Sequence, residues 1–142
     1  MISLRHVGLI VSNIDNSLKL YRDVLGFIPK IDQVESGDFY QHLTGIENGI
    51  ARTCKCFAHD GSCIELIEYQ SHKEKMRTKD ILSSGFNHIA INVDDISSLE
   101  IQLKKLDIKF INEPKLNDIK NAKVAFCYDF EENLIELVQT YE

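Results

Sequence analysis

Two histidines and two glutamates recur at matching places in the two halves of the chain. His6 lies in LRHVGLIVSNI, and His88 lies at the same position of FNHIAINVDDI, 82 residues further on. Glu65 lies in CIEL and Glu136 in LIEL. Imidazole nitrogens and carboxylate oxygens bind divalent first-row metals, and a metal with open positions can activate a substrate through its oxygens. The sequence therefore suggests a metal site with four protein ligands.

The residues after each histidine alternate between apolar and other side chains. Such alternation predicts a strand with one buried face, so the histidine lies on the opposite face. On that face it is followed by Gly8 and Ile10 in the first copy and by Ala90 and Asn92 in the second. These mostly small or polar side chains could line a cavity.

Each glutamate belongs to a later strand of its own half. In CIELIEY, Ile64 and Leu66 are expected to face the core, which leaves Glu65 on the other face. A carboxylate among apolar neighbours is costly to desolvate unless a positive group meets it. If the first and last strands of each half pair, His6 lies beside Glu65 and His88 lies beside Glu136. A pseudo-two-fold relation between the halves would then bring the two pairs together.

The remaining elements also repeat. Helices are expected over residues 15–25 and from about residue 96 to 106, because each has an apolar stripe at spacings of three and four. Asn13 or Asp15 could cap the first helix and Asp94 or Asp95 the second, and Gly26 could end the first. Further strands are expected from residue 27, over 52–58, 62–69, 108–111 and 123–128, and in the final NLIELVQ, with loops at 39–49 and 115–121. The fold class is α+β, with two modules of strand, helix and three strands.

The boundaries follow the repeat and the composition. One domain covers residues 1–142, with a first module at 1–70, a polar and charged linker at 71–84 and a second module at 85–142.

A net charge of -6 disfavours nucleic acid and anionic membranes as partners. The sequence shows no membrane span and no signal peptide, which favours a cytoplasmic protein. The four cysteines lie in strand-like segments, as expected for buried reduced thiols.

None of the two histidines and two glutamates would indicate a functional site by itself. A lone histidine on a strand is usually structural, and a lone glutamate usually faces solvent. Four of them at equivalent positions of a duplicated unit favour a shared site. His42, His59 and His72 have no matched partner and lie in or beside predicted loops, so they are expected at the surface.

The chain resembles the vicinal oxygen chelate superfamily, which includes glyoxalases, bleomycin-resistance proteins and extradiol dioxygenases. The resemblance covers essentially the whole chain and is carried by HVGLIVSNIDNSLKLYRDVLGF, GSCIELIEY, FNHIAINVDDISSLEIQLKKL and ENLIELVQ. It implies an open β half-barrel that lines a cleft, a homodimer, and metal ligands at His6, Glu65, His88 and Glu136. The order His, Glu, His, Glu is similar to bacterial glyoxalase I, whose metal is usually nickel or cobalt. One divalent ion per site is expected, either nickel, cobalt, zinc, manganese or iron.

The resemblance also implies a reaction. A glyoxalase-like lyase or isomerase would move a proton next to a carbonyl in a small chelating substrate, with Glu136 as base, Glu65 as its counterpart and the two histidines as ligands only. Glyoxalase I holds glutathione with an arginine and an asparagine at positions where this chain has Ile10 and Tyr69. One alternative is an epimerase of acyl thioesters similar to methylmalonyl-CoA epimerase, which has a glutamine in place of Glu65. Another is a non-catalytic protein that binds an antibiotic or other small molecule.

Overall fold

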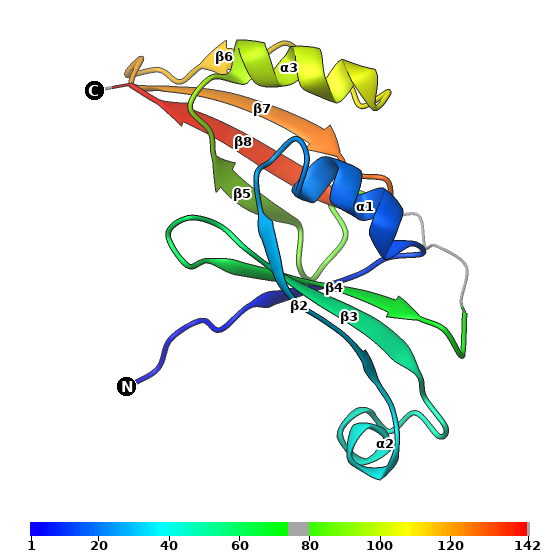
Figure 1. The fold of residues 1–142 in the computed structure, drawn as a ribbon. Coiled ribbons are helices and arrows are strands. Elements are labelled where there is room, and N and C mark those ends of the chain that lie inside the picture. The colour runs from blue at the N-terminus through cyan, green and yellow to red at the C-terminus, as the bar shows by residue number, and fades with distance from the viewer. Residues whose placement is uncertain (74–79, 142) are drawn as a thin grey trace. The chain divides into compact units, whose positions relative to one another are not determined.

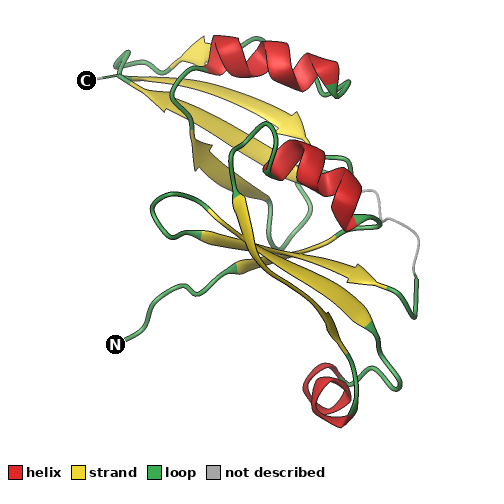
Figure 2. Cartoon of the chain, viewed as in Figure 1, coloured by secondary structure: helices red, strands yellow, loops and turns green. Residues whose placement is uncertain are grey.

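The computed structural model describes residues 1–73 and 80–141. The chain divides into two compact units, residues 1–76 and 77–142. Each unit has its own four-stranded sheet and a long helix, and the elements follow one another along the chain as labelled in Figure 1 and coloured by type in Figure 2. The charged run that the sequence assigns to a linker falls largely at residues 74–79, outside the described residues.

The first unit contains four strands and two helices. They are β1 (Val7–Ile10), α1 (Ile14–Tyr21), β2 (Ile28–Glu35), α2 (Asp38–Thr44), β3 (Ala51–Phe57) and β4 (Cys63–Tyr69). The sheet order is β1-β4-β3-β2, with β1 parallel to β4 and the other pairs antiparallel. The first strand of the module therefore pairs with its last strand, as the sequence predicts.

The second unit repeats this topology. Its elements are β5 (His88–Asn92), α3 (Ile96–Lys105), β6 (Lys115–Leu116), β7 (Ala122–Tyr128) and β8 (Leu134–Thr140). The sheet order is β5-β8-β7-β6, and β5 runs parallel to β8. Two open, mixed sheets with helices confirm the predicted α+β class and the repeated strand, helix and three-strand module.

Each sheet packs one face against its helix. In the first unit, α1 contacts β4, and the core includes Ile64 and Leu66 of β4 with Leu18 and Tyr21 of α1, all of them buried. In the second unit, α3 contacts β7 and β8, and Leu103, Ile135 and Leu137 are buried. The alternation of the strands therefore leaves Glu65 and Glu136 on the faces turned away from the helices.

Helices α1 and α3 begin in the same way. Asn13 caps α1 by accepting a hydrogen bond from the Asn16 amide, and Asp95 caps α3 through the Ser97 amide. A second acceptor comes from the last strand of each module. Glu68 Oε2 accepts from the Ile14 amide at 2.9 Å, and Gln139 Oε1 accepts from the Ile96 amide at 3.0 Å. Because helix-initial amides have no partner within the helix, these side chains tie each helix to its sheet.

Three predictions about individual elements are wrong. The first helix ends at Tyr21 rather than Leu25, and the residues after it form hydrogen-bonded turns that reach Gly26, whose φ of 77° ends the segment. The strand predicted at 108–111 is reduced to one bridge between Phe110 and Cys127. The outer strand is instead β6, in a stretch predicted as a loop, because Asn117 and Asn121 close a tight turn between β6 and β7.

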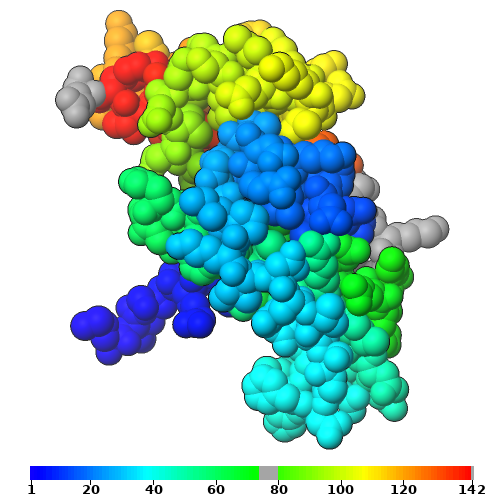
Figure 3. Space-filling view, viewed as in Figure 1, coloured from blue at the N-terminus to red at the C-terminus, as the bar shows by residue number. Residues whose placement is uncertain are grey.

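Part of the segment predicted as a loop at 39–49 forms helix α2. None of its residues is buried, and Phe39 and Leu43 are 74% and 63% exposed. Tyr40 is half-buried, and its hydroxyl lies 3.3 Å from the hydroxyl of Tyr69 on β4. The cyan residues in Figure 3 show this segment at the surface of the first unit. Within the described residues, no helix has both the length and the apolar character needed to cross a membrane.

Candidate metal centre

The first predicted pair lies on the face of sheet one that is turned away from α1. His6 precedes β1, and the parallel register places Gly8 beside Glu65 of β4. His6 Nε2 lies 3.0 Å from Glu65 Oε2, with the two side chains 28% and 13% exposed. The other ring nitrogen of His6, Nδ1, is buried and has no hydrogen-bond partner among the described residues. The predicted contact between this histidine and this glutamate is confirmed.

A lysine that the sequence alone does not indicate also contacts the glutamate of the first pair. Lys55 lies directly opposite Glu65 in the antiparallel ladder of β3 and β4. Its Nζ atom is 3.0 Å from Glu65 Oε1, and its side chain is only 19% exposed. The positive group that a glutamate in this place needs is thus present.

The second predicted pair has the same geometry in the other unit. His88 begins β5, and Ala90 lies beside Glu136 of β8. His88 Nε2 is 3.1 Å from Glu136 Oε2, with the side chains 35% and 24% exposed. Both histidines therefore present Nε2 to a carboxylate oxygen of the last strand.

The surroundings of the second pair differ from those of the first. Phe126 of β7, rather than a lysine, lies opposite Glu136. Its ring packs edge-on against His88, with the centroids 5.5 Å apart and the planes at 85°. Asn87 Oδ1 lies 2.7 Å from the second ring nitrogen of His88. Glu65 is thus held by a cation, whereas Glu136 has an aromatic neighbour.

The donor atoms of both pairs suit a divalent metal. A histidine nitrogen and a carboxylate oxygen about 3 Å apart can bind one ion between them, and two such pairs supply two nitrogens and two oxygens. Within each unit taken alone, the described residues contain no group of three or more histidine, cysteine or acidic side chains that could hold a metal ion. Each pair is therefore half of the set that the sequence predicts.

Several other residues named from the sequence can now be placed. Cys54, Cys56 and Cys127 are buried free thiols, and Cys63 is half-buried and free. Burial raises the pKa of Cys56 and of Cys127 to about 12. Three of the four cysteines are therefore buried as expected, whereas Cys63 is partly exposed.

The face of sheet one around Glu65 is largely apolar. Ile10 lies beside Ile67 and is 65% exposed. Tyr69 is on the same strand face as Glu65. Burial, and next the hydrogen bond with the Tyr69 hydroxyl, raise the pKa of Tyr40. Ile10 and Tyr69 bring no charge to the positions where the glyoxalase I resemblance leads one to expect an arginine and an asparagine.

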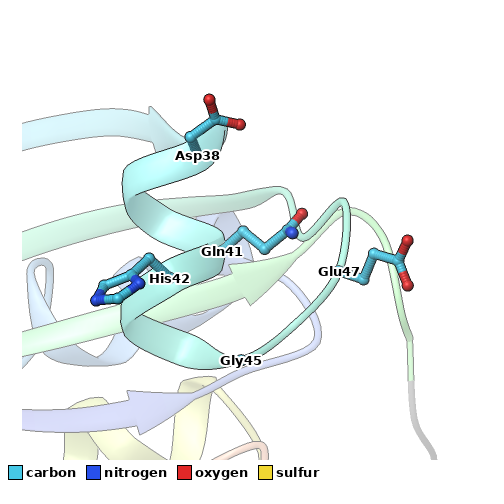
Figure 4. Close-up of a pocket in the computed structure, with 5 residues that line it drawn as sticks. All are labelled: Asp38, Gln41, His42, Gly45 and Glu47. Carbon is cyan, nitrogen blue, oxygen red and sulfur yellow. The ribbon is translucent and has the colours of Figure 1, made fainter.

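A surface hollow elsewhere in the first unit does not coincide with the histidine and glutamate pair. It is lined by Asp38, Gln41, His42, Gly45 and Glu47. In Figure 4 the side chains of Asp38, His42 and Glu47 point away from one another, so they do not converge on a ligand. His42 is exposed, as are His59 and His72, which agrees with their predicted place at the surface.

Comparison with known proteins identifies the family of the chain. The sequence model of the Glyoxalase/Bleomycin resistance protein/Dioxygenase superfamily matches residues 3–137. The chain belongs to this superfamily. The resemblance seen in the sequence is therefore confirmed at the level of the family and the fold.

Individual relatives of this superfamily carry glyoxalase names. The chain is 29% identical over 138 residues to a probable lactoylglutathione lyase of Synechocystis sp., covering 96% of this chain and 95% of that protein. It is also 29% identical over 153 residues to a lactoylglutathione lyase of Schizosaccharomyces pombe, covering 98% of this chain and 48% of that protein. These names point to an enzyme of the glyoxalase type as the kind of protein to which this chain is similar.

Solved structures of the superfamily share the fold. A glyoxalase family protein from Bacillus cereus matches with a TM-score of 0.91 at 19% identity, covering 100% of this chain and 96% of that chain. The fosfomycin resistance protein FosX from Listeria monocytogenes, solved with Mn(II) and sulfate, matches with a TM-score of 0.63 at 18% identity, covering 98% of this chain and 93% of that chain. At these identities the likeness establishes the fold alone.

Proposed function

We propose that this chain is a divalent-metal-dependent lyase or isomerase of the glyoxalase type. Its substrate would be a small molecule with two neighbouring oxygens, and the reaction would move a proton at the carbon next to a carbonyl. The observation that carries the proposal is the repeated contact of a histidine Nε2 with a glutamate oxygen at 3.0 and 3.1 Å, once in each module. The names of the two 29% identical relatives support the same reaction class.

His6, Glu65, His88 and Glu136 would hold the ion together, with the two pairs contributed by one chain or by two chains of a homodimer. A bound divalent ion supplies positive charge to the substrate oxygens and stabilises the negative charge that develops when the neighbouring carbon loses its proton. Nickel, cobalt, zinc, manganese and iron all suit this set of donors. The histidines serve only as ligands.

Glu136 is the proposed base, and Glu65 is its counterpart in the other module. Glu136 would take the proton from one carbon and return it to the adjacent atom of the substrate. The structure supports a division of roles, because Lys55 holds Oε1 of Glu65 at 3.0 Å while the residue opposite Glu136 is the uncharged Phe126. A carboxylate fixed by an ammonium group on one side and a histidine on the other is less free to move.

The substrate need not carry glutathione. Ile10 and Tyr69 offer apolar and hydroxyl surface near Glu65 rather than the arginine and asparagine expected for glutathione binding. An acyl thioester is the second substrate to test, because epimerisation of such a compound uses the same proton removal next to a carbonyl.

Metal analysis of the purified protein, followed by parallel assays with hemithioacetals and acyl thioesters, tests the proposal. Wild-type protein is expected to convert one of these substrates, and Glu136→Gln is expected to lose at least about a hundredfold in kcat, in line with general base catalysis. Lys104→Gln, on the exposed side of α3, is the matched control and should leave kcat unchanged. Metal-stripped protein that binds its ligand at full strength would instead indicate a binding protein.

A further inference from the structure

The side chain of Asn87 is held in one orientation by the segment before it. Its amide nitrogen Nδ2 donates a hydrogen bond to the carbonyl oxygen of Ile81 at 2.7 Å. The amide oxygen Oδ1 must then face the other way, where it lies 2.7 Å from Nδ1 of His88. The Ile81 carbonyl thus settles which end of the amide meets the histidine.

This contact bears on where the proton of a neutral His88 lies. Both ring nitrogens face an oxygen that can only accept, and the contact of Nδ1 with Asn87 Oδ1, at 2.7 Å, is shorter than the 3.1 Å contact of Nε2 with Glu136 Oε2, so the geometry favours hydrogen on Nδ1. The other nitrogen, Nε2, then offers a lone pair, and it is the atom that lies 3.1 Å from Glu136 Oε2. A lone pair and a carboxylate oxygen that face each other are both acceptors, and a cation between them satisfies both.

We infer that Asn87 is a positioning residue that fixes the ring and the tautomer of His88, so that Nε2 is ready to bind a metal. The edge-on contact with Phe126 restrains the same ring from another side. Hydrogen bonding of the second ring nitrogen commonly orients metal-binding histidines, and its loss typically weakens metal binding by about 10-fold to 100-fold. The consequence for metal binding rests on the proposed function, whereas the tautomer of His88 does not.

The first module lacks this arrangement. The residue before His6 is Arg5, whose guanidinium can donate hydrogen bonds but cannot accept one. Nδ1 of His6 is buried without a hydrogen-bond partner among the described residues. Among the described residues, both rings contact a glutamate through Nε2, and His88 also has a hydrogen-bond partner at Nδ1, whereas His6 has none there.

Two substitutions separate the contact with His88 from the contact with Ile81. Asn87→Leu removes both hydrogen bonds, whereas Asn87→Asp loses the donor to Ile81 but keeps an oxygen that can accept from Nδ1. Arg5→Leu, at the corresponding place in the first module, is the matched control. A change in the His88 tautomer or in zinc affinity that both Asn87 variants share would come from the lost hydrogen bond to Ile81. A change seen in Asn87→Leu alone would come from the lost contact with His88.

The first measurement is ¹⁵N NMR of the histidine rings in metal-free protein at pH 8.5. We expect hydrogen on Nδ1 of His88 in wild type, Asn87→Asp and Arg5→Leu, and a shift toward hydrogen on Nε2 in Asn87→Leu. An unchanged tautomer in Asn87→Leu would overturn the inference. Hydrogen on both nitrogens of wild-type His88 at this pH would also overturn it.

The second measurement is zinc affinity, determined by competition with a coloured chelator. Asn87→Leu should bind zinc about 10-fold more weakly than wild type, while Asn87→Asp and Arg5→Leu should not lose affinity. Equal weakening in Asn87→Leu and Asn87→Asp would overturn the role in metal binding. Wild-type protein that binds no zinc or other divalent ion would contradict the proposed function, and the NMR result would still decide the role of Asn87.

Discussion

Lys55 Nζ lies 3.0 Å from Glu65 Oε1, directly across the ladder between β3 and β4. Glu65 Oε2 is 3.0 Å from His6 Nε2, so the two oxygens of one carboxylate contact two different basic side chains. The glutamate of the second module faces Phe126 at the place where Glu65 faces Lys55. The duplicated modules are therefore alike in their proposed ligands and different in the residues that support them.

Loss of the Lys55 ammonium group should destabilise the first unit. Lys55→Met leaves a carboxylate that is 13% exposed without its cation, and the expected loss in the free energy of unfolding is about 2 kcal/mol. Denaturant unfolding of metal-free protein measures it. In a Glu65→Gln background the same lysine substitution should have a much smaller effect. Equal losses in both backgrounds would show that Lys55 does not act through Glu65.

The side chains that tie each helix to its sheet give a second prediction. Glu68→Ala removes the acceptor for the Ile14 amide and should lower the free energy of unfolding by about 1 kcal/mol, the usual effect of losing a helix cap. Glu68→Gln should lose only a few tenths of that, because Gln139 makes the same bond to Ile96 in the second module. If Glu68→Gln were as destabilised as Glu68→Ala, charge rather than hydrogen bonding would be the important property.

Stability at alkaline pH should depend on a buried thiol. Burial is the main cause, and the negative charge of Asp129 the second, that raises the pKa of Cys127 from its ordinary 9.0 to about 12 in the folded chain. Since the unfolded thiol loses its proton first, this contribution to stability is complete below pH 9 and is lost between about pH 9 and pH 12. The slope attributable to this one group approaches about 1.4 kcal/mol per pH unit.

A comparison of wild type with Cys127→Ala checks this prediction. Both proteins are unfolded with denaturant at intervals from pH 8 to pH 11, and the difference between their free energies of unfolding is plotted against pH. That difference should be constant below pH 9 and should shrink above it. A difference that stays constant over the whole range would mean that Cys127 is not buried as the structure describes.

The sequence predicted the two histidine and glutamate contacts because both depend on simple periodic features. Alternation placed His6 and Glu65 on one face of their strands, and the repeat implied the same for His88 and Glu136. The pairing of the first and last strands then brought each histidine to its glutamate. These contacts follow from strand periodicity and pairing alone and do not depend on a balance of competing energies.

The supporting residues could not be derived in the same way. Lys55 matters because of the register of the hairpin, and Asn87 matters because the carbonyl of Ile81 orients its amide. Neither contact follows from a repeating pattern in the sequence. The two-residue strand β6 was missed for a similar reason, because it is held by the turn between Asn117 and Asn121 rather than by an apolar pattern of its own.

Calorimetric titration of metal-free protein with a divalent ion tests the central proposal, that two histidine and glutamate pairs share one ion. The proposal predicts one ion per chain, whether the pairs come from one chain or from two. It also predicts that His88→Ala abolishes this binding, although the His6 and Glu65 pair remains intact. Two ions per chain, or an unchanged affinity in His88→Ala, would contradict a shared metal centre.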